Sequence, residues 1–231
     1  MTTHDYSAEL LAGYWAGRQG AGLRDETACG RLRLAGEERG AFLQRLTTND
    51  VRLQPGQGAV TILTSPTARI LAVLTVLAQE DSLLLLAGPG QGPAVYEALR
   101  GQIFFQDRVT IAGQGNALAQ FGLLGPQAGQ VLAACGLAAC ADLPLWAWRS
   151  AALGKAAVTV QRNEGLFGAG YTLLCPAAAG QALRSALLRG GAAPLPEEAY
   201  HVLRVEAGQP APGFELTDQV SDPRPHPPPV A

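Results

Sequence analysis

The sequence is poor in lysine and histidine and has no long apolar run, and each shortage excludes a class of protein. Its 17 basic side chains are outnumbered by 19 acidic ones, for a net charge of -2, so no basic surface for nucleic acid is predicted. The most apolar stretches, 70–78 and 83–87, are too short to span a bilayer, and residues 1–13 lack the features of a secretory signal. We therefore expect a cytoplasmic protein that contacts neither nucleic acid directly nor a membrane.

Cysteine and histidine are also too scattered to form a metal site or a disulfide framework. The cysteines have no CxxC spacing and sit among apolar residues, which indicates structural thiols. The residues concerned are Cys29, Cys135, Cys140, Cys175, His4, His201 and His226. The glycine-rich run 88–92 lacks the Lys-Ser/Thr of a phosphate-binding P-loop and is predicted to be a loop.

What the sequence does contain is an apolar content of 48% with 16% charged residues, which is typical of a globular protein with a large core. The order strand, helix, three strands, helix occurs twice, with Gly36 and Gly125 at matching hinges. This order predicts an α+β fold with mainly antiparallel sheets. We expect a first unit at 21–113, a second at 114–218 and a proline-rich extended tail at 219–231.

The individual elements follow from hydrophobic periodicity and from turn residues. Strands are predicted at 31–34, 59–64, 70–78, 83–87, 108–112, 118–124, 145–151, 156–162 and 171–175. Helices are predicted at 37–48, 94–100, 126–135, 178–189 and from Tyr200 to Gly208, with one turn at 10–15 that the glycine-rich run 17–22 then breaks. Trp146 and Trp148 fall on one face of a predicted strand, which indicates packing in a core or an interface.

The most diagnostic segment lies near the end of the chain. Arg204-Val205-Glu206-Ala207-Gly208, followed by Gly213-Phe214-Glu215-Leu216, resembles the glycine cleavage T-protein (aminomethyltransferase) superfamily. Within that superfamily it is most similar to the YgfZ-type folate-binding proteins of iron–sulfur metabolism. Further motifs in the same order are Asp25-x-Thr27, Thr48-Asn49-Asp50-Val51, Phe104-Phe105-x-Asp107-x-Val109, Leu123-x-Gly125-Pro126 and Gly170-Tyr171-x-Leu173-x-x-Pro176.

The resemblance implies that tetrahydrofolate binds in a cleft between the two units, which a third, C-terminal barrel domain usually closes. Tyr200 occupies a position at the family's folate site and could stack on the pterin, or could simply pack on the core. Arg162 resembles a family arginine near the cleft and could meet the folate carboxylates, or could be a solvated residue at a strand end. Arg204 is a third candidate, with structural ion pairing as its alternative role.

Departures from the family pattern point away from aminomethyl transfer. The catalytic acid of the transferases matches apolar positions within 68–73, and their pterin-binding glutamate matches Phe167-Gly168. We therefore predict a groove with no proton-handling side chain and no catalytic residue. The YgfZ motif Lys-Gly-Cys-Tyr is also missing after Glu215-Leu216. A naturally shortened protein, an altered reading frame or a cut chain would each explain this.

The leading hypothesis is a folate-binding protein of the YgfZ type that supports iron–sulfur cluster assembly or repair and, through its client enzymes, tRNA modification. A first alternative is a one-carbon transferase that uses other groups, with Asp50 or Glu164 as the acid. A second alternative is a truncated scaffold without a ligand, which forms a homodimer through its exposed inter-unit face.

Overall fold

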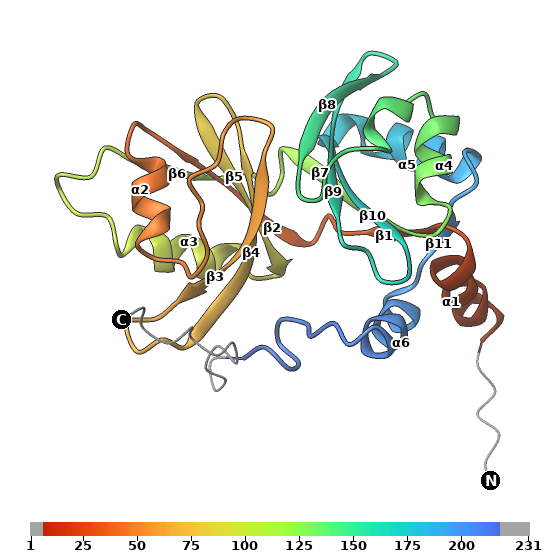
Figure 1. Ribbon diagram of the computed structural model, residues 1–231, viewed down its shortest axis with the longest axis horizontal. Coiled ribbons are helices and arrows are strands. Elements are labelled where there is room, and N and C mark those ends of the chain that lie inside the picture. Colours follow the sequence, from red (N-terminus) through yellow and green to blue (C-terminus); the bar gives the residue numbers. More distant parts are fainter. Residues whose placement is uncertain (1–6, 218–231) are drawn as a thin grey trace, which may run out of the picture.

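The computed structural model describes residues 7–217, which form two β-sheets side by side (Figure 1). The five-stranded sheet has the order β3-β4-β5-β2-β6, and the six-stranded sheet has the order β11-β1-β7-β10-β9-β8. The pairings between neighbouring strands of this region are antiparallel, apart from the parallel pair β1 and β11. The predicted α+β class with mainly antiparallel sheets is therefore confirmed.

The elements have the following bounds. The strands of the five-stranded sheet are β2 (Cys29–Ala35), β3 (Gly58–Thr64), β4 (Ile70–Ala78), β5 (Ser82–Pro89) and β6 (Thr110–Gly113). Those of the six-stranded sheet are β1 (Gly22–Asp25), β7 (Leu118–Gly125), β8 (Trp148–Leu153), β9 (Ala156–Asn163), β10 (Ala169–Pro176) and β11 (Ala193–Pro194). The α-helices are α1 (Ala8–Gln19), α2 (Arg39–Gln44), α3 (Gly92–Arg100), α4 (Ala128–Ala134), α5 (Gly180–Arg189) and α6 (Glu197–Glu206). In the region that the structure covers, no helix has the length and apolarity needed to cross a membrane.

Each sheet buries one face under a pair of helices. Phe42 and Leu99 bring α2 and α3 onto the core of the five-stranded sheet, and Leu132 and Leu187 bring α4 and α5 onto the core of the six-stranded sheet. The remaining faces of the two sheets turn toward each other and meet through a small cluster made of Leu77, Leu84, Leu86 and Leu174, with Trp148 packed against it. The indole Nε1 of Trp148 donates to the carbonyl oxygen of Ala78 at 3.0 Å, which also joins the two sheets.

Strand β1 lies in a different sheet from the rest of the predicted first unit. Residues 22–25 pair with β7 and β11, because Leu23 is buried in the core of the six-stranded sheet. The boundary predicted at residue 113 therefore does not coincide with the division between the sheets, and the units 21–113 and 114–218 stay a prediction about organisation. The predicted tail, 219–231, lies outside the described residues.

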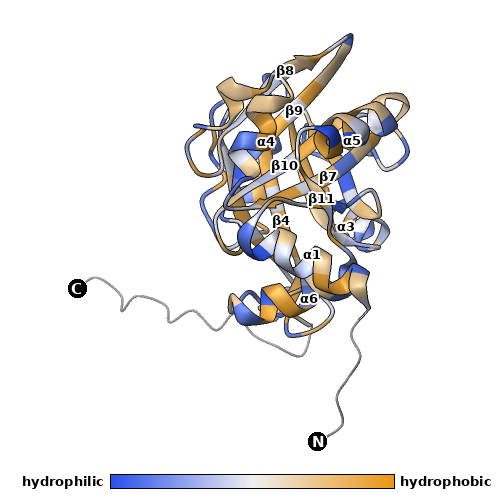
Figure 2. Cartoon of the chain, turned by 90° about the vertical axis from the view of Figure 1, so that its right-hand side faces the viewer, coloured by the Kyte–Doolittle hydropathy of each residue, from blue (hydrophilic) through white to orange (hydrophobic). Residues whose placement is uncertain are grey.

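The N-terminal helix is longer than predicted. Helix α1 begins after Ser7, whose hydroxyl accepts from the backbone N–H of Leu10 at 3.2 Å, and it continues through Gly17. The prediction that the glycine-rich run 17–22 breaks the helix at its first residue is wrong, because Gly17 is helical. A Cβ on Gly17 would lie 2.5 Å from Cδ1 of Leu203, so the glycine lets α1 pack closely against α6. Figure 2 shows these two helices side by side at one end of the molecule.

Candidate ligand-binding cleft

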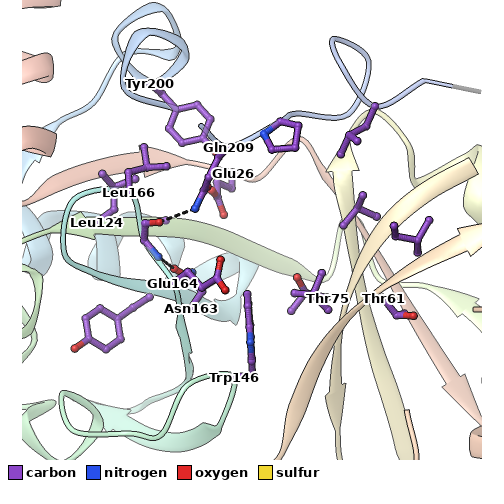
Figure 3. Close-up of a pocket in the computed structure, with 18 of the residues that line it drawn as sticks. Glu26, Thr61, Thr75, Leu124, Trp146, Asn163, Glu164, Leu166, Tyr200 and Gln209 are labelled. Carbon is purple, nitrogen blue, oxygen red and sulfur yellow. Dashed lines mark hydrogen bonds between the residues drawn. The ribbon is translucent and has the colours of Figure 1, made fainter. Parts of the chain in front are cut away.

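A cleft of about 510 Å³ opens between the two sheets, beside the cluster that joins them. Side chains from β3 and β4 form one wall, and β7 with the turn between β9 and β10 forms the other. Tyr200 from α6 and the segment that follows this helix, at Gln209, Pro210 and Leu216, complete the lining. Figure 3 shows the Tyr200 and Trp146 rings at opposite ends of the group of side chains, with Glu26 and Glu164 between them.

Trp146 lines the cleft and has a left-handed backbone, with φ of +65°. Its N–H donates to the carbonyl of Arg162 at 2.9 Å, and its own carbonyl lies against Gly58, where a Cβ would come within 2.5 Å. A bulky residue in this conformation is strained by about 1–2 kcal/mol. Strand β8 begins only at Trp148, so Trp146 precedes it, but both rings lie between the two sheets: Trp146 lines the cleft and Trp148 packs against the cluster beside it. This agrees with the predicted packing in a core or an interface.

Tyr200 lines the cleft as predicted, and one face of its ring is already covered. The guanidinium carbon of Arg24 lies 3.9 Å from the centre of this ring. Arg24 is itself held by both carboxylate oxygens of Glu197, at 2.8 and 2.9 Å, and by Glu26 at 3.1 Å. Burial raises the pKa of Tyr200, so the ring carries a neutral phenol at neutral pH. A planar ligand could stack on the uncovered face.

Two carboxylates line the cleft, so the prediction of a groove without any acid is wrong. Glu26 is engaged on both oxygens, by Arg24 and by the side-chain amide of Gln120 at 3.1 Å. It fits beneath β7 because Gly122 has no side chain, and a Cβ there would come within 2.6 Å of the carboxylate. Glu164 is exposed and has no hydrogen-bond or ion-pair partner among residues 7–217. It is therefore the carboxylate that is free to receive a ligand.

Asp50, the other acid considered from the sequence, does not line this cleft but borders an adjoining hollow that shares Trp146 and Glu164 with it. Its carboxylate pairs with Arg52 at 2.7 Å, and the hydrogen bonds from Arg52 lower the pKa of Asp50 to about 2. An exposed carboxylate with such a low pKa stays ionised and cannot serve as a general acid at neutral pH.

Arg162 and Arg204 are engaged inside the protein, and neither lines the cleft. Arg162 donates to the carbonyls of Asn163 and Gly170 and supports the turn between β9 and β10. Arg204 is only 4% exposed and binds Glu215 at 2.8 Å, the Nδ1 atom of His201 at 2.9 Å and the carbonyl of Gln209 at 3.3 Å. It thus anchors the segment after α6 that borders the cleft. The roles of both arginines as folate ligands stay predictions.

The cleft brings aromatic, apolar, amide and carboxylate groups together, and these suit a flat heterocycle with a polar edge. Its amides are partly committed: Gln209 donates to the carbonyl of Gly165 at 2.8 Å, and Asn163 donates to the hydroxyl of Thr172 at 3.1 Å. No group of three or more His, Cys, Asp or Glu side chains that could hold a metal ion occurs in the described part of the chain.

The two sheets define the class of the fold, that of the glycine cleavage aminomethyltransferase T. The chain belongs to the GCVT N-terminal domain family, whose pattern matches residues 3–223. The predicted T-protein superfamily is thereby confirmed, while the YgfZ branch within it stays a prediction.

Relatives of known sequence and structure agree with this family. A putative chloroplastic transferase of Arabidopsis thaliana is 29% identical over 191 residues, which cover 82% of this chain and 44% of that protein. An aminomethyltransferase of Desulforamulus reducens is 27% identical over 219 residues, covering 92% of this chain and 59% of the relative. The glycine cleavage aminomethyltransferase T of Bartonella henselae has the same fold, with a TM-score of 0.80 and 23% identity over 92% of this chain and 58% of that one. The chain thus spans about half the length of these relatives.

Proposed function

We propose that the cleft between the sheets binds a reduced folate such as tetrahydrofolate. The observation that carries this proposal is that Trp146, Tyr200 and the unpartnered carboxylate of Glu164 line one cleft of about 510 Å³. A pterin has flat faces that stack on aromatic rings, and the N–H groups on its edge can donate hydrogen bonds to a carboxylate. In this assignment Glu164 accepts hydrogen bonds from the N–H groups on the pterin edge, and the ring of Tyr200 or Trp146 stacks on one face of the pterin.

We further propose that the protein binds folate without transferring an aminomethyl group, as the YgfZ type does. The cleft residues that correspond to the transferase acid segment are apolar, at Ile70 and Val73. Bound folate would supply one-carbon chemistry only if a protonatable group reached the nitrogens that carry the one-carbon unit. In this assignment Glu164 meets the N–H groups of the pterin edge instead, and Glu26, which is held on both oxygens, is poorly placed to move a proton. Support of iron–sulfur enzymes, and of tRNA modification through them, is the role that the YgfZ resemblance suggests.

Titration with tetrahydrofolate tests the binding proposal. We expect saturable heat in calorimetry, because the ligand replaces water on an aromatic ring and pairs with a free carboxylate. Glu164→Gln should weaken affinity about tenfold, because a hydrogen bond to a charged group is replaced by a bond to a neutral one. Glu80→Gln is the matched control, since this exposed glutamate lies outside the cleft. Absence of heat and of any thermal shift at millimolar ligand would remove the folate assignment.

A one-carbon transferase is the second candidate, favoured by one observation. Glu164 is a free acid inside the cleft, and several relatives are aminomethyltransferases. If the chain is a transferase, methylene-tetrahydrofolate should turn over and Glu164→Ala should abolish the turnover. Turnover that survives Glu164→Ala would exclude Glu164 as the acid, and binding without turnover would support the proposed non-catalytic role.

A further inference from the structure

A second cavity, of about 530 Å³, lies on the other side of the connection between β1 and β2. Glu26 borders the folate cleft, whereas the next residue, Thr27, borders this cavity, and the two linings share no residue. The second cavity is bounded by the start of α3, by the glycine-rich turn before it and by the loop between β6 and β7 at Gly115 and Asn116. It is therefore a separate candidate site.

Arg31 is the unusual feature of this cavity, because it is a buried cation and the acid that acts on its charge, Asp25, does so only from beyond ion-pair distance. It is only 3% exposed and lines the cavity, and in the described region no carboxylate lies within ion-pair distance of it. Its Nη2 donates to the carbonyls of Thr27 at 2.8 Å and Gly115 at 2.7 Å, which both border the cavity, and its Nη1 donates to the carbonyl of Glu26 at 3.3 Å. Its Nε has no acceptor. Removal of such a charge from water is costly, and burial lowers the pKa of Arg31 accordingly.

The first turn of α3 contributes a second source of positive potential. This helix has nine residues, with Gly92 and Pro93 at its start, and no side chain caps its N-terminus. The side chain of Gln91 accepts instead from the N–H of Gly88 at 3.2 Å. The N-terminal N–H groups of a helix carry a partial positive charge and bind oxyanions, and in α3 Gly92 supplies such a group at the cavity whereas Pro93 has none. Close contact between Gly30 and Gly92, where a Cβ on Gly30 would come within 2.7 Å of the Gly92 nitrogen, holds the helix start against β2.

We propose that this cavity binds the phosphate group of a small phosphorylated molecule or free phosphate. The guanidinium of Arg31, which has carbonyl acceptors but no ion-pair partner among residues 7–217, and the uncapped start of α3 border one space, and both attract a compact oxyanion. The cavity exceeds the size of phosphate alone, and the apolar surfaces of Leu32, Pro93 and Tyr96 would cover an attached organic group. Glu97 is the opposing charge on the rim, where it is exposed and lies 4.0 Å from Arg100. This site is independent of the proposed folate cleft.

Phosphorus NMR titrations at constant ionic strength test the site, with inorganic phosphate and glycerol phosphate as the two probes. We expect saturable binding of at least one probe, and the tighter one identifies the source of the phosphate group. Arg31→Met should weaken binding more than tenfold, with circular dichroism as the check on folding.

Two rim variants keep the test decisive even if Arg31→Met does not fold. Glu97→Gln should tighten phosphate binding roughly two- to threefold, and Gly115→Asp should weaken it by a similar factor, since each changes one charge near the anion. Gly115 has open space around a Cβ, so the added side chain meets no clash. Glu80→Gln should leave the affinity unchanged. Absence of saturable binding, or rim variants that change affinity in the same direction or not at all, would overturn the proposal.

Discussion

Gly36→Ala should lower the free energy of unfolding by more than about 3 kcal/mol, because it combines a forbidden conformation with a clash. Gly36 joins β2 to α2 with φ of +113°, outside the range that alanine readily adopts. A Cβ at this position would lie 2.0 Å from the carbonyl oxygen of Arg108 and 2.9 Å from Cα of Val109. Both contacts are with backbone, which cannot move aside as a flexible side chain would. Urea denaturation followed by circular dichroism measures the change.

Gly136→Ala is the matched control for this prediction. Gly136 also has a positive φ, of +80°, but nothing lies within 4 Å of a Cβ built on it. The free energy of unfolding of the control should therefore fall only by the cost of the left-handed backbone, about 1–2 kcal/mol. If the two variants lost the same free energy of unfolding, the backbone around the Arg108 carbonyl would be moving away from the new Cβ without a cost in stability.

Much of the fold could be predicted because each sheet has one helix-covered face and clear turn residues. The strand predicted at 70–78 coincides with β4, and both predicted hinge glycines, Gly36 and Gly125, have positive φ values. Strands β1 and β11 were missed because they have only four and two residues, respectively. Their pairing joins Gly22 to Leu124 and to Ala193, and no local pattern can reveal partners so distant in the chain.

The cleft was only partly predictable, because its side chains converge from distant segments. Tyr200 was identified through the family resemblance, and it does line the cleft. Glu26 comes from a connection between sheets, and its approach depends on Gly122, nearly a hundred positions away. Trp146 and Trp148 both lie between the sheets, as packing in an interface requires. The left-handed backbone of Trp146 could not be predicted, because a tryptophan gives no sequence signal for that conformation.

Trp146→Gly and Trp146→Ala should both weaken tetrahydrofolate binding about tenfold, because loss of a stacking ring costs roughly 1–3 kcal/mol. The two variants should differ in stability. Glycine adopts φ of +65° without strain, so Trp146→Gly should be more stable than Trp146→Ala by about 1 kcal/mol. Calorimetric titration measures the affinity, and urea denaturation measures the stability.

Trp148→Phe is the control for the same pair of measurements, because its ring lies in the cluster between the sheets and not in the cleft. It should lose stability through the missing hydrogen bond to the Ala78 carbonyl while it keeps folate affinity. The opposite pattern, with affinity lost at Trp148 and kept at Trp146, would place the ligand against the inter-sheet cluster. If Trp146→Gly bound tetrahydrofolate with wild-type affinity, Tyr200 alone would provide the stacking surface. Trp146 would then have a structural role at the contact between the two sheets.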